Sequence, residues 1–250
     1  MDAERINRTA ATYDVGMRMR VLHLAALLLS PAALGAPPHA DGGVAEERAV
    51  SAEARALVPP LLRYGTFTPE AGRWVEFDVE QPGVGKHVER LSVVGVTETQ
   101  RGPLYQVELD VRVQPHVELY LWVLGGRAPA VDRLAVTLNG GDAVSIPVEL
   151  PLAEPSLRGA PAGTSNGPVA KAPFAGPTTV ATWDEPPPVG RVTARRSAAV
   201  PLVGLAALEH QGTRWTARAT GTGATPTLRS VPLSVPRLGA QPNGKPSTTQ

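Results

Sequence analysis

The chain has 250 residues, with 24 Lys or Arg against 23 Asp or Glu and a formal net charge of +1. A balance this close to neutrality gives no electrostatic basis for binding nucleic acid or an anionic membrane surface. Cysteine is absent, which excludes disulfides, thiolate zinc sites and a lipid anchor attached to a cysteine after a signal.

Residues 17–40 begin with MRMRVLHLAALLLSPAALGA and have the order of a secretion signal. Arg18 and Arg20 supply the basic part, Val21 to Leu29 supply the apolar part, and the small residues up to Ala40 offer peptidase sites. The apolar run is shorter than the about 20 residues of a transmembrane helix, so no membrane span is predicted. We expect a cleaved signal peptide and a periplasmic or secreted mature protein.

The segment ahead of this signal, residues 1–16, carries mixed charges that do not suit a signal peptide. We expect the true start to be Met17 or Met19, with residues 1–16 assigned to the protein by a start codon placed too early. The alternative is a long cytoplasmic tail on a signal anchor, and the short apolar run argues against it.

One helix is predicted after the signal, over residues 44–58, because VAEERAVSAEARALV is rich in Ala, Glu and Arg. Pro59-Pro60 is expected to end it. Residues 37–43 ahead of the helix are a polar leader.

From Gly72 to Leu152 the hydrophobic period is two residues. In RWVEFDVE the apolar Val75, Phe77 and Val79 alternate with acidic residues, and LYQVELDVRV repeats the pattern. Asn139-Gly140 predicts a hairpin turn. Strict alternation is typical of an antiparallel sheet with one packed face and one solvated face.

The later part of the chain is expected to continue the same domain after an interruption. Residues 151–177 are rich in Pro, Gly and Ala and predict a long loop. Strand patterns resume in TTVATW, GRVTARRS, LAALEH and TRWTARATG. Residues 236–250 are expected to be a disordered tail. We therefore predict a single β-rich domain over residues 44–235.

One sequence motif is compatible with an enzyme. Gly163-Thr164-Ser165-Asn166-Gly167 matches the G-x-S-x-G nucleophile elbow of α/β-hydrolases, so a serine esterase that uses Ser165 is an alternative function. The elbow requires a strand, a sharp turn and a helix, and the expected loop provides none of them. No catalytic residue is therefore predicted.

The histidines are scattered, and none has the spacing of a metal-binding motif. A metal site would have to be assembled in three dimensions from distant residues. We predict neither a metal site nor a cofactor.

The strand predicted at residues 116–124 is apolar on both faces. Tyr120 and Trp122 share one face, while the other carries Val and Leu side chains. A strand packed between a sheet and a helix would have this pattern, and so would the wall of an apolar ligand cavity. Tyr120 and Trp122 are the predicted ligand-binding residues.

The order of these pieces resembles the outer-membrane lipoprotein-sorting, or lipoprotein-carrier-like, proteins that bacteria secrete. Gly72-x-Trp74-x-x-Phe77 is similar to their G-x-W-x-x-Y start, and residues 200–224 are similar to a strand pair near their C-terminal end. The resemblance covers spaced fragments of residues 64–224. It implies an incomplete, strongly curved antiparallel barrel around a helix, with a concavity for acyl chains and no catalytic residue.

The sequence therefore predicts a mainly β, non-catalytic binding or envelope-maintenance protein. A lipid or the acyl chain of a lipoprotein is the expected partner. A structural or interaction module of the cell envelope is an alternative, beside the serine esterase.

Overall fold

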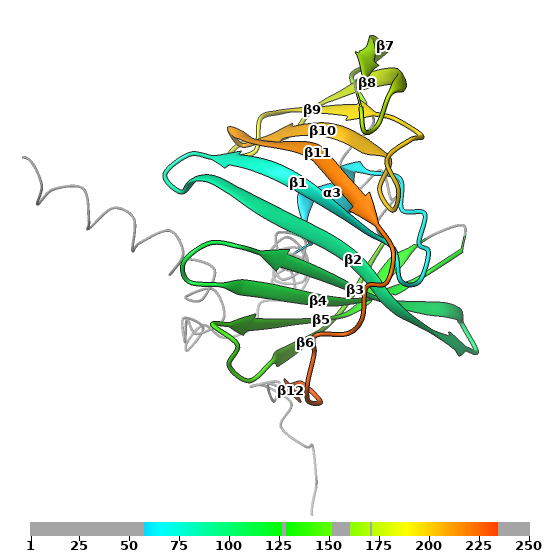
Figure 1. Cartoon of the computed structure of the whole chain (residues 1–250), viewed down its shortest axis with the longest axis vertical. Helices are drawn as coiled ribbons and strands as arrows, with labels where there is room; N and C mark the ends of the chain where they lie inside the picture. Colours follow the sequence, from blue (N-terminus) through cyan, green and yellow to red (C-terminus); the bar gives the residue numbers. More distant parts are fainter. Residues whose placement is uncertain (1–57, 127–128, 152–160, 171, 235–250) are drawn as a thin grey trace, which may run out of the picture.

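A computed structural model describes residues 58–126, 129–151, 161–170 and 172–234 (Figure 1). The predicted signal peptide, the predicted helix except Val58, and the predicted tail from residue 236 lie outside the described residues. The fold below therefore concerns the β-rich part of the chain.

Twelve strands form one sheet in the order β12-β6-β5-β4-β3-β2-β1-β11-β10-β9-β8-β7. The strands are β1 (Trp74–Gln81), β2 (Gly85–Thr99), β3 (Gly102–Val111), β4 (Val117–Leu124), β5 (Ala130–Leu138), β6 (Val144–Pro151), β7 (Gly163–Ala170), β8 (Gly176–Asp184), β9 (Arg191–Arg196), β10 (Leu205–His210), β11 (Thr213–Gly221) and β12 (Leu233–Ser234). All neighbours are antiparallel except β12 and β6, which are parallel. The predicted mainly β, antiparallel and curved sheet is confirmed, and the sheet is not closed (Figure 1).

The sheet consists of two meanders that meet at β1 and β11. Strands β1 to β6 follow one another outward on one side, and β7 to β11 approach from the other. In the register that joins them, Val79 pairs with Trp215 of β11 and with His87 of β2. Segments far apart in the sequence thus become neighbours in the middle of the sheet.

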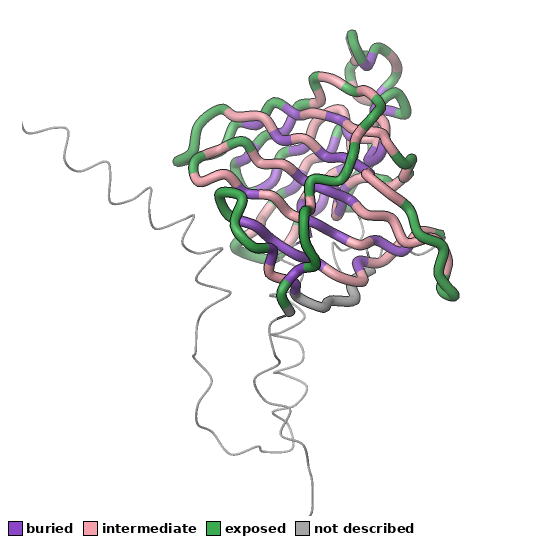
Figure 2. The backbone as a smooth tube through the Cα atoms, turned by 60° about the horizontal axis from the view of Figure 1, so that its bottom comes forward, coloured by how far each residue is buried: buried purple, intermediate pink, exposed green. Residues whose placement is uncertain are grey.

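The two faces of the sheet differ as the alternation predicts. On β1, Val75, Phe77 and Val79 are at most 1% exposed and lie on the face that we call inner. The intervening residues lie on the outer face. Figure 2 shows buried residues along the strands and exposed residues at the connections.

The predicted hairpin turn at Asn139-Gly140 is present between β5 and β6. Asn139 has φ 52° and Gly140 has φ 69°, both in the left-handed region that such a tight turn requires, and this turn opens a connection that runs over residues 139–143. The N–H of Gly141 donates to the carbonyl of Leu138 at 3.0 Å.

One helix is described, α3 (Pro60–Tyr64), and it begins at a proline that was expected to end a helix. Proline suits this first helical position, because it needs no N–H donor there and already has a helical φ. The expected end of the 44–58 helix at Pro59-Pro60 stays a prediction, because that helix lies outside the described residues except for Val58. The N–H groups of Leu62 and Arg63 donate to the carbonyl of Pro59 at 3.0 and 3.1 Å.

The expected loop at residues 151–177 contains β7, which pairs with β8. The expectation failed because β7 lies at the end of the sheet and exposes nearly all its side chains, so no apolar period marks it. Gly167 leaves room for Thr178, whose hydroxyl donates to the carbonyl of Pro168 at 2.6 Å.

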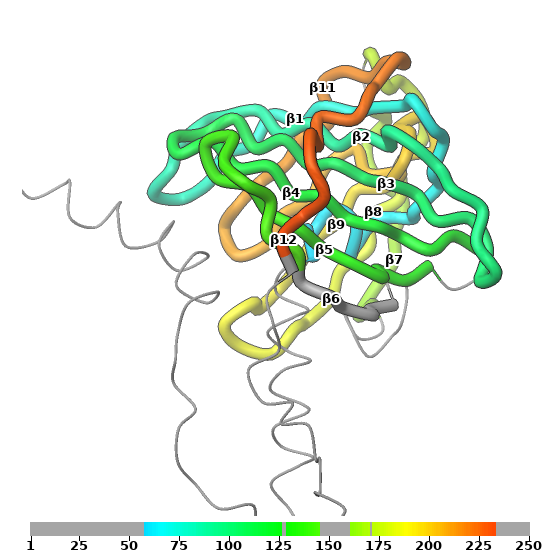
Figure 3. The backbone as a smooth tube through the Cα atoms, turned by 90° about the horizontal axis from the view of Figure 1, so that it is seen from below, coloured from blue at the N-terminus to red at the C-terminus, as the bar shows by residue number. Residues whose placement is uncertain are grey.

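Residues 222–232 connect β11 to β12 by crossing the outer face of the sheet, and we call them the strap (Figures 1 and 3). The N–H of Ala224 donates to the carbonyl of Gly72 at 2.9 Å. Beyond the strap, the N–H of Leu233 donates to the carbonyl of Ala143 at 2.7 Å. The strap is thus anchored at both ends of its path.

Candidate functional site

The larger of the two clusters of buried apolar side chains in the described residues lies on the inner face. This cluster runs from β5 through β1 to β8 without a break. Members from the strands are Val75, Phe77, Val79, Leu91, Val93, Val107, Leu109, Leu121, Val123, Val131, Leu134, Ala181, Trp183, Val192, Ala194, Leu205, Leu208 and Trp215. Each strand contributes every second side chain to this face, and most of the side chains at these positions are aliphatic.

Near β10, the inner face is covered by α3 and by the loop before β10. Leu61, Leu62 and Tyr64 of α3 are at most 1% exposed. The N–H of Thr66 donates to the carbonyl of Val203 at 2.8 Å, which fixes the chain after α3 against that loop. In Figure 1, α3 lies behind β1 and β2, on the side opposite the strap.

A buried carboxylate interrupts the apolar surface at one end of β2. Glu89 is 7% exposed, and its Oε2 accepts a hydrogen bond of 2.8 Å from the indole N–H of Trp215. Nε2 of His87 lies 3.3 Å from Oε1 of the same carboxylate. Nδ1 of His87 is buried and has no hydrogen-bond partner. Sequence reasoning missed Glu89, although it shares the two-residue period of Leu91 and Val93.

A second group of polar side chains surrounds Tyr64 on the same face. Its hydroxyl donates to Oε1 of Glu185 at 3.1 Å, and its carbonyl accepts a hydrogen bond of 3.0 Å from Arg196. The ring centroid of Tyr64 lies 5.3 Å from that of Trp183 and 5.6 Å from that of His210. Polar and aromatic groups from α3, β8, β9 and β10 therefore meet here.

His210 is held in its neutral form. Burial, with a smaller contribution from the positive charge of Arg63, lowers the pKa of His210 to about 4. The Nε2 atom of His210 is buried without a hydrogen-bond partner. At neutral pH the inner face thus holds an uncharged imidazole with one nitrogen unused.

The two predicted ligand-binding residues lie on the outer face. Tyr120 is 2% exposed and forms a small separate cluster with Ala135 and Ala143, against which Trp122 and Leu228 pack. Its hydroxyl donates to Oε2 of Glu118 at 2.8 Å, and burial raises its pKa. The second apolar face of this strand, predicted to meet a helix or a ligand, therefore meets the strap through Leu228.

Trp122 is partly buried beside this cluster. The guanidinium carbon of Arg133 lies 4.6 Å from the centroid of its ring, within the range of a cation–π interaction. Trp122 of β4 and Arg133 of β5 are partners in the register of the sheet. A ligand-binding role for Tyr120 and Trp122 stays a prediction.

Ser165 lies inside β7, where it pairs with Val180 of β8. Its side chain is exposed, and its hydroxyl makes no hydrogen bond to any described residue. The strand continues to Ala170, so Ser165 does not occupy the sharp turn between strand and helix that defines a nucleophile elbow. The motif match has a different local structure from that of the hydrolases.

Two further observations describe the rest of the described chain. Across its four ranges, no group of three or more His, Asp or Glu side chains is placed to hold a metal ion. None of the helical residues in those ranges forms a segment long and apolar enough to cross a membrane.

Comparison of the chain with protein-family models and with curated proteins finds no match to either.

Proposed function

We propose that the protein is a non-catalytic binding protein of the periplasm or the extracellular space, and that its inner face takes the acyl chain of a lipid or lipoprotein. The observation that carries this proposal is the unbroken cluster of buried apolar side chains on the inner face of an open, curved sheet. The members of this cluster are at most 7% exposed, so the acyl chain enters between side chains that pack together without it. Binding is then favoured because the hydrocarbon of the ligand leaves water.

The shape of the sheet supports a long ligand. The cluster extends across the strands from β5 to β8, whereas α3 has five residues and contacts the sheet mainly at β10. Because the sheet does not close, its edges at β12 and β7 can separate without breaking hydrogen bonds between strands. An open sheet can thus admit a chain that a closed barrel would exclude.

The buried polar groups of the inner face support an amphiphilic ligand. Nδ1 of His87 and Nε2 of His210 are buried without partners, and burying a polar atom without a hydrogen bond is unfavourable. A polar group at one end of an amphiphile can satisfy such an atom while its hydrocarbon covers the aliphatic residues. The resemblance to lipoprotein carriers points to the same class of ligand.

The experiment uses protein made from the full chain and purified from an envelope fraction. Native mass spectrometry should show a species heavier than the polypeptide by the mass of a lipid. After delipidation, palmitate should raise the melting temperature, because a ligand that binds only the folded state stabilises it. Hexanoate, which has the same carboxylate and a short chain, should raise it much less.

The proposal fails if no lipid accompanies the protein and palmitate leaves the melting temperature unchanged. Equal shifts with palmitate and hexanoate would also contradict it, because they would show recognition of the carboxylate alone. An envelope interaction module without a lipid ligand would then explain the protein better.

A further inference from the structure

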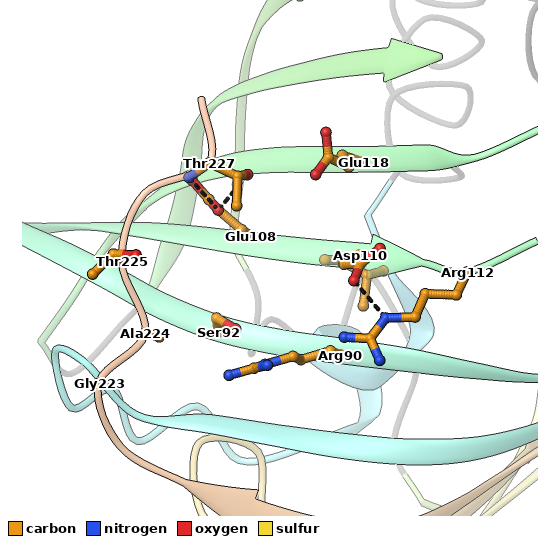
Figure 4. Close-up of a pocket in the computed structure, with 11 residues that line it drawn as sticks. Arg90, Ser92, Glu108, Asp110, Arg112, Glu118, Gly223, Ala224, Thr225 and Thr227 are labelled. Carbon is orange, nitrogen blue, oxygen red and sulfur yellow. Dashed lines mark hydrogen bonds and ion pairs between the residues drawn. The ribbon is translucent and has the colours of Figure 1, made fainter. Parts of the chain in front are cut away.

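The outer face holds a polar cavity that the proposed acyl-chain site does not use. It has a volume of about 230 Å³ and lies between the strap and strands β2, β3 and β4. Figure 4 shows the strap passing over one side of it, with charged side chains rising from the strands. A cavity of this size has room for several non-hydrogen atoms, since one water occupies about 30 Å³ of the liquid.

Arg90 places a fixed positive charge in this cavity. Its guanidinium carbon lies 4.1 Å from the centroid of the Trp74 ring, which holds the side chain in a stacked position. In the register of the sheet Arg90 has Glu76 on one side and Asp110 on the other. Its guanidinium nevertheless makes no hydrogen bond or ion pair with any described residue.

Other arginines occupy the carboxylates that flank Arg90. Nε of Arg112 lies 2.8 Å from Oδ2 of Asp110, and a terminal nitrogen of Arg112 lies 3.4 Å from Glu76. Arg218 lies 3.9 Å from the other oxygen of Glu76. The guanidinium N–H groups of Arg90 are therefore available to a ligand, and their planar arrangement suits a carboxylate.

The strap holds the indole ring of Trp74, against which Arg90 stacks. The indole N–H of Trp74 donates to the carbonyl of Thr222 at 3.2 Å, and a Cβ on Gly221 would lie 2.5 Å from the indole ring. The indole is thus pressed against the backbone where the strap begins. Ser92, which lies across from Trp74 in the register, adds a hydroxyl at the same end of the cavity.

Carboxylates line the other end of the cavity. Asp110 and Glu118 are neighbours across β3 and β4. Tyr120 and Thr137 both donate to Oε2 of Glu118, at 2.8 and 3.2 Å, and Oε1 of Glu118 accepts no hydrogen bond from a described residue. This end therefore offers a carboxylate oxygen to a positively charged group.

We infer that the cavity binds an extended zwitterion, with its carboxylate on Arg90 and Ser92 and its ammonium group at Oε1 of Glu118. Arg90 and Glu118 lie two strand spacings apart, about 10 Å, so a chain of several carbons must separate the two charges of the ligand.

Asp110 is not available to the ammonium group, because Arg112 and His116 hold its two oxygens at 2.8 and 2.7 Å. The lining carries two arginines and three carboxylates, so a dianion such as phosphate would meet net negative charge. A molecule with one charge of each sign matches both ends. This site is independent of the acyl-chain proposal, because it lies on the opposite face.

The test is an NMR titration of the full chain with four probes: 6-aminohexanoate, acetate, methylammonium and inorganic phosphate. 6-Aminohexanoate should shift the amide signals of Arg90, Ser92 and Glu118, and should bind at least tenfold more tightly than any other probe. Arg90→Gln should weaken 6-aminohexanoate binding at least tenfold. Arg214→Gln is the matched control, because Arg214 is exposed and paired with Glu209 on β11 and β10.

Glu118→Gln distinguishes the two ends of the cavity. It keeps an oxygen that can accept from Tyr120 and Thr137 but removes the charge, so 6-aminohexanoate binding should weaken while acetate binding does not. Circular dichroism of each variant confirms that the sheet is intact. Equal binding of acetate and 6-aminohexanoate, tighter binding of phosphate, or unchanged 6-aminohexanoate binding by Arg90→Gln would each overturn the inference.

Discussion

Glu108 on β3 and Thr227 in the strap are joined through both carboxylate oxygens. The N–H of Thr227 lies 3.1 Å from Oε2 and 3.2 Å from Oε1, and its hydroxyl donates to Oε2 at 2.8 Å. Gln106 also donates to Oε1, at 2.9 Å. Glu108 is only 5% exposed and has no ion-pair partner in the described chain, so these hydrogen bonds are what stabilise its charge.

Thr227→Val should therefore destabilise the protein by about 1–2 kcal/mol, because a buried carboxylate loses a hydroxyl donor and a nearly isosteric methyl replaces it. Thr222→Val is the matched control, since the Thr222 side chain is exposed and its hydroxyl makes no hydrogen bond with a described residue. Urea unfolding of both variants provides the measurement. Equal losses would show that the Glu108 contact contributes nothing specific.

Gly65→Ala should destabilise the protein by about 1–3 kcal/mol through overpacking. A Cβ at Gly65 would lie 2.5 Å from the carbonyl oxygen of Leu61 and 2.7 Å from that of Val203, and neither backbone atom can move aside as a side chain would. Gly95→Ala is the control, because nothing lies within 4 Å of a Cβ there. If thermal unfolding shows the two variants to be alike, α3 does not pack against the 200–203 loop as described.

Stability should fall as the pH is lowered from 6.5 to about 4, the interval between the ordinary pKa of histidine and that of His210 in the fold. Over this interval the unfolded chain binds a proton at His210 and the folded protein does not, so the free energy of unfolding decreases. Above pH 6.5 both states are neutral and the effect disappears.

The full loss should not exceed about 3 kcal/mol, which is the shift converted to free energy. His210→Phe keeps an aromatic ring beside Tyr64 and should remove this part of the pH dependence. The measurement is a series of urea unfolding curves between pH 4 and 7.5. An unchanged pH slope in the variant would show that His210 is not the group responsible.

Ser165→Ala should leave any esterase activity of a preparation unchanged, because Ser165 lies within a strand and its hydroxyl has no described hydrogen-bond partner. Hydrolysis of p-nitrophenyl acyl esters by wild type and variant provides the comparison. A loss of hydrolysis in a variant that remains folded would favour the serine-esterase alternative.

The alternation of the sequence was enough to predict the central strands and their buried faces. Val75, Phe77 and Val79 all lie inside, because a strand between two others must bury every second side chain. The edge strand β7 could not be predicted this way, since main-chain pairing with β8 holds it and its side chains face solvent.

The candidate sites were less predictable. Glu108 was expected on a solvated face, and it is buried because the strap returns from far along the chain to cover it. Arg90 and Glu118 likewise lie in one row across three paired strands, with Asp110 between them, a relationship that spacing in the sequence does not reveal. Tyr120 and Trp122 were identified as bulky residues on a second apolar face, but the sequence did not indicate that Leu228 packs on it.

Paramagnetic relaxation by a nitroxide-labelled stearate tests the acyl-chain proposal most directly, because it reports which face the hydrocarbon contacts without any substitution. With methyl-labelled protein, the signals of Leu109, Leu121 and Leu134 on the inner face should broaden at stoichiometric ligand and recover when the nitroxide is reduced. Leu228 on the outer face and the exposed Leu138 should keep their intensities. Broadening of Leu228 and Leu138 with the inner methyl groups unaffected, or no broadening at all, would contradict the account.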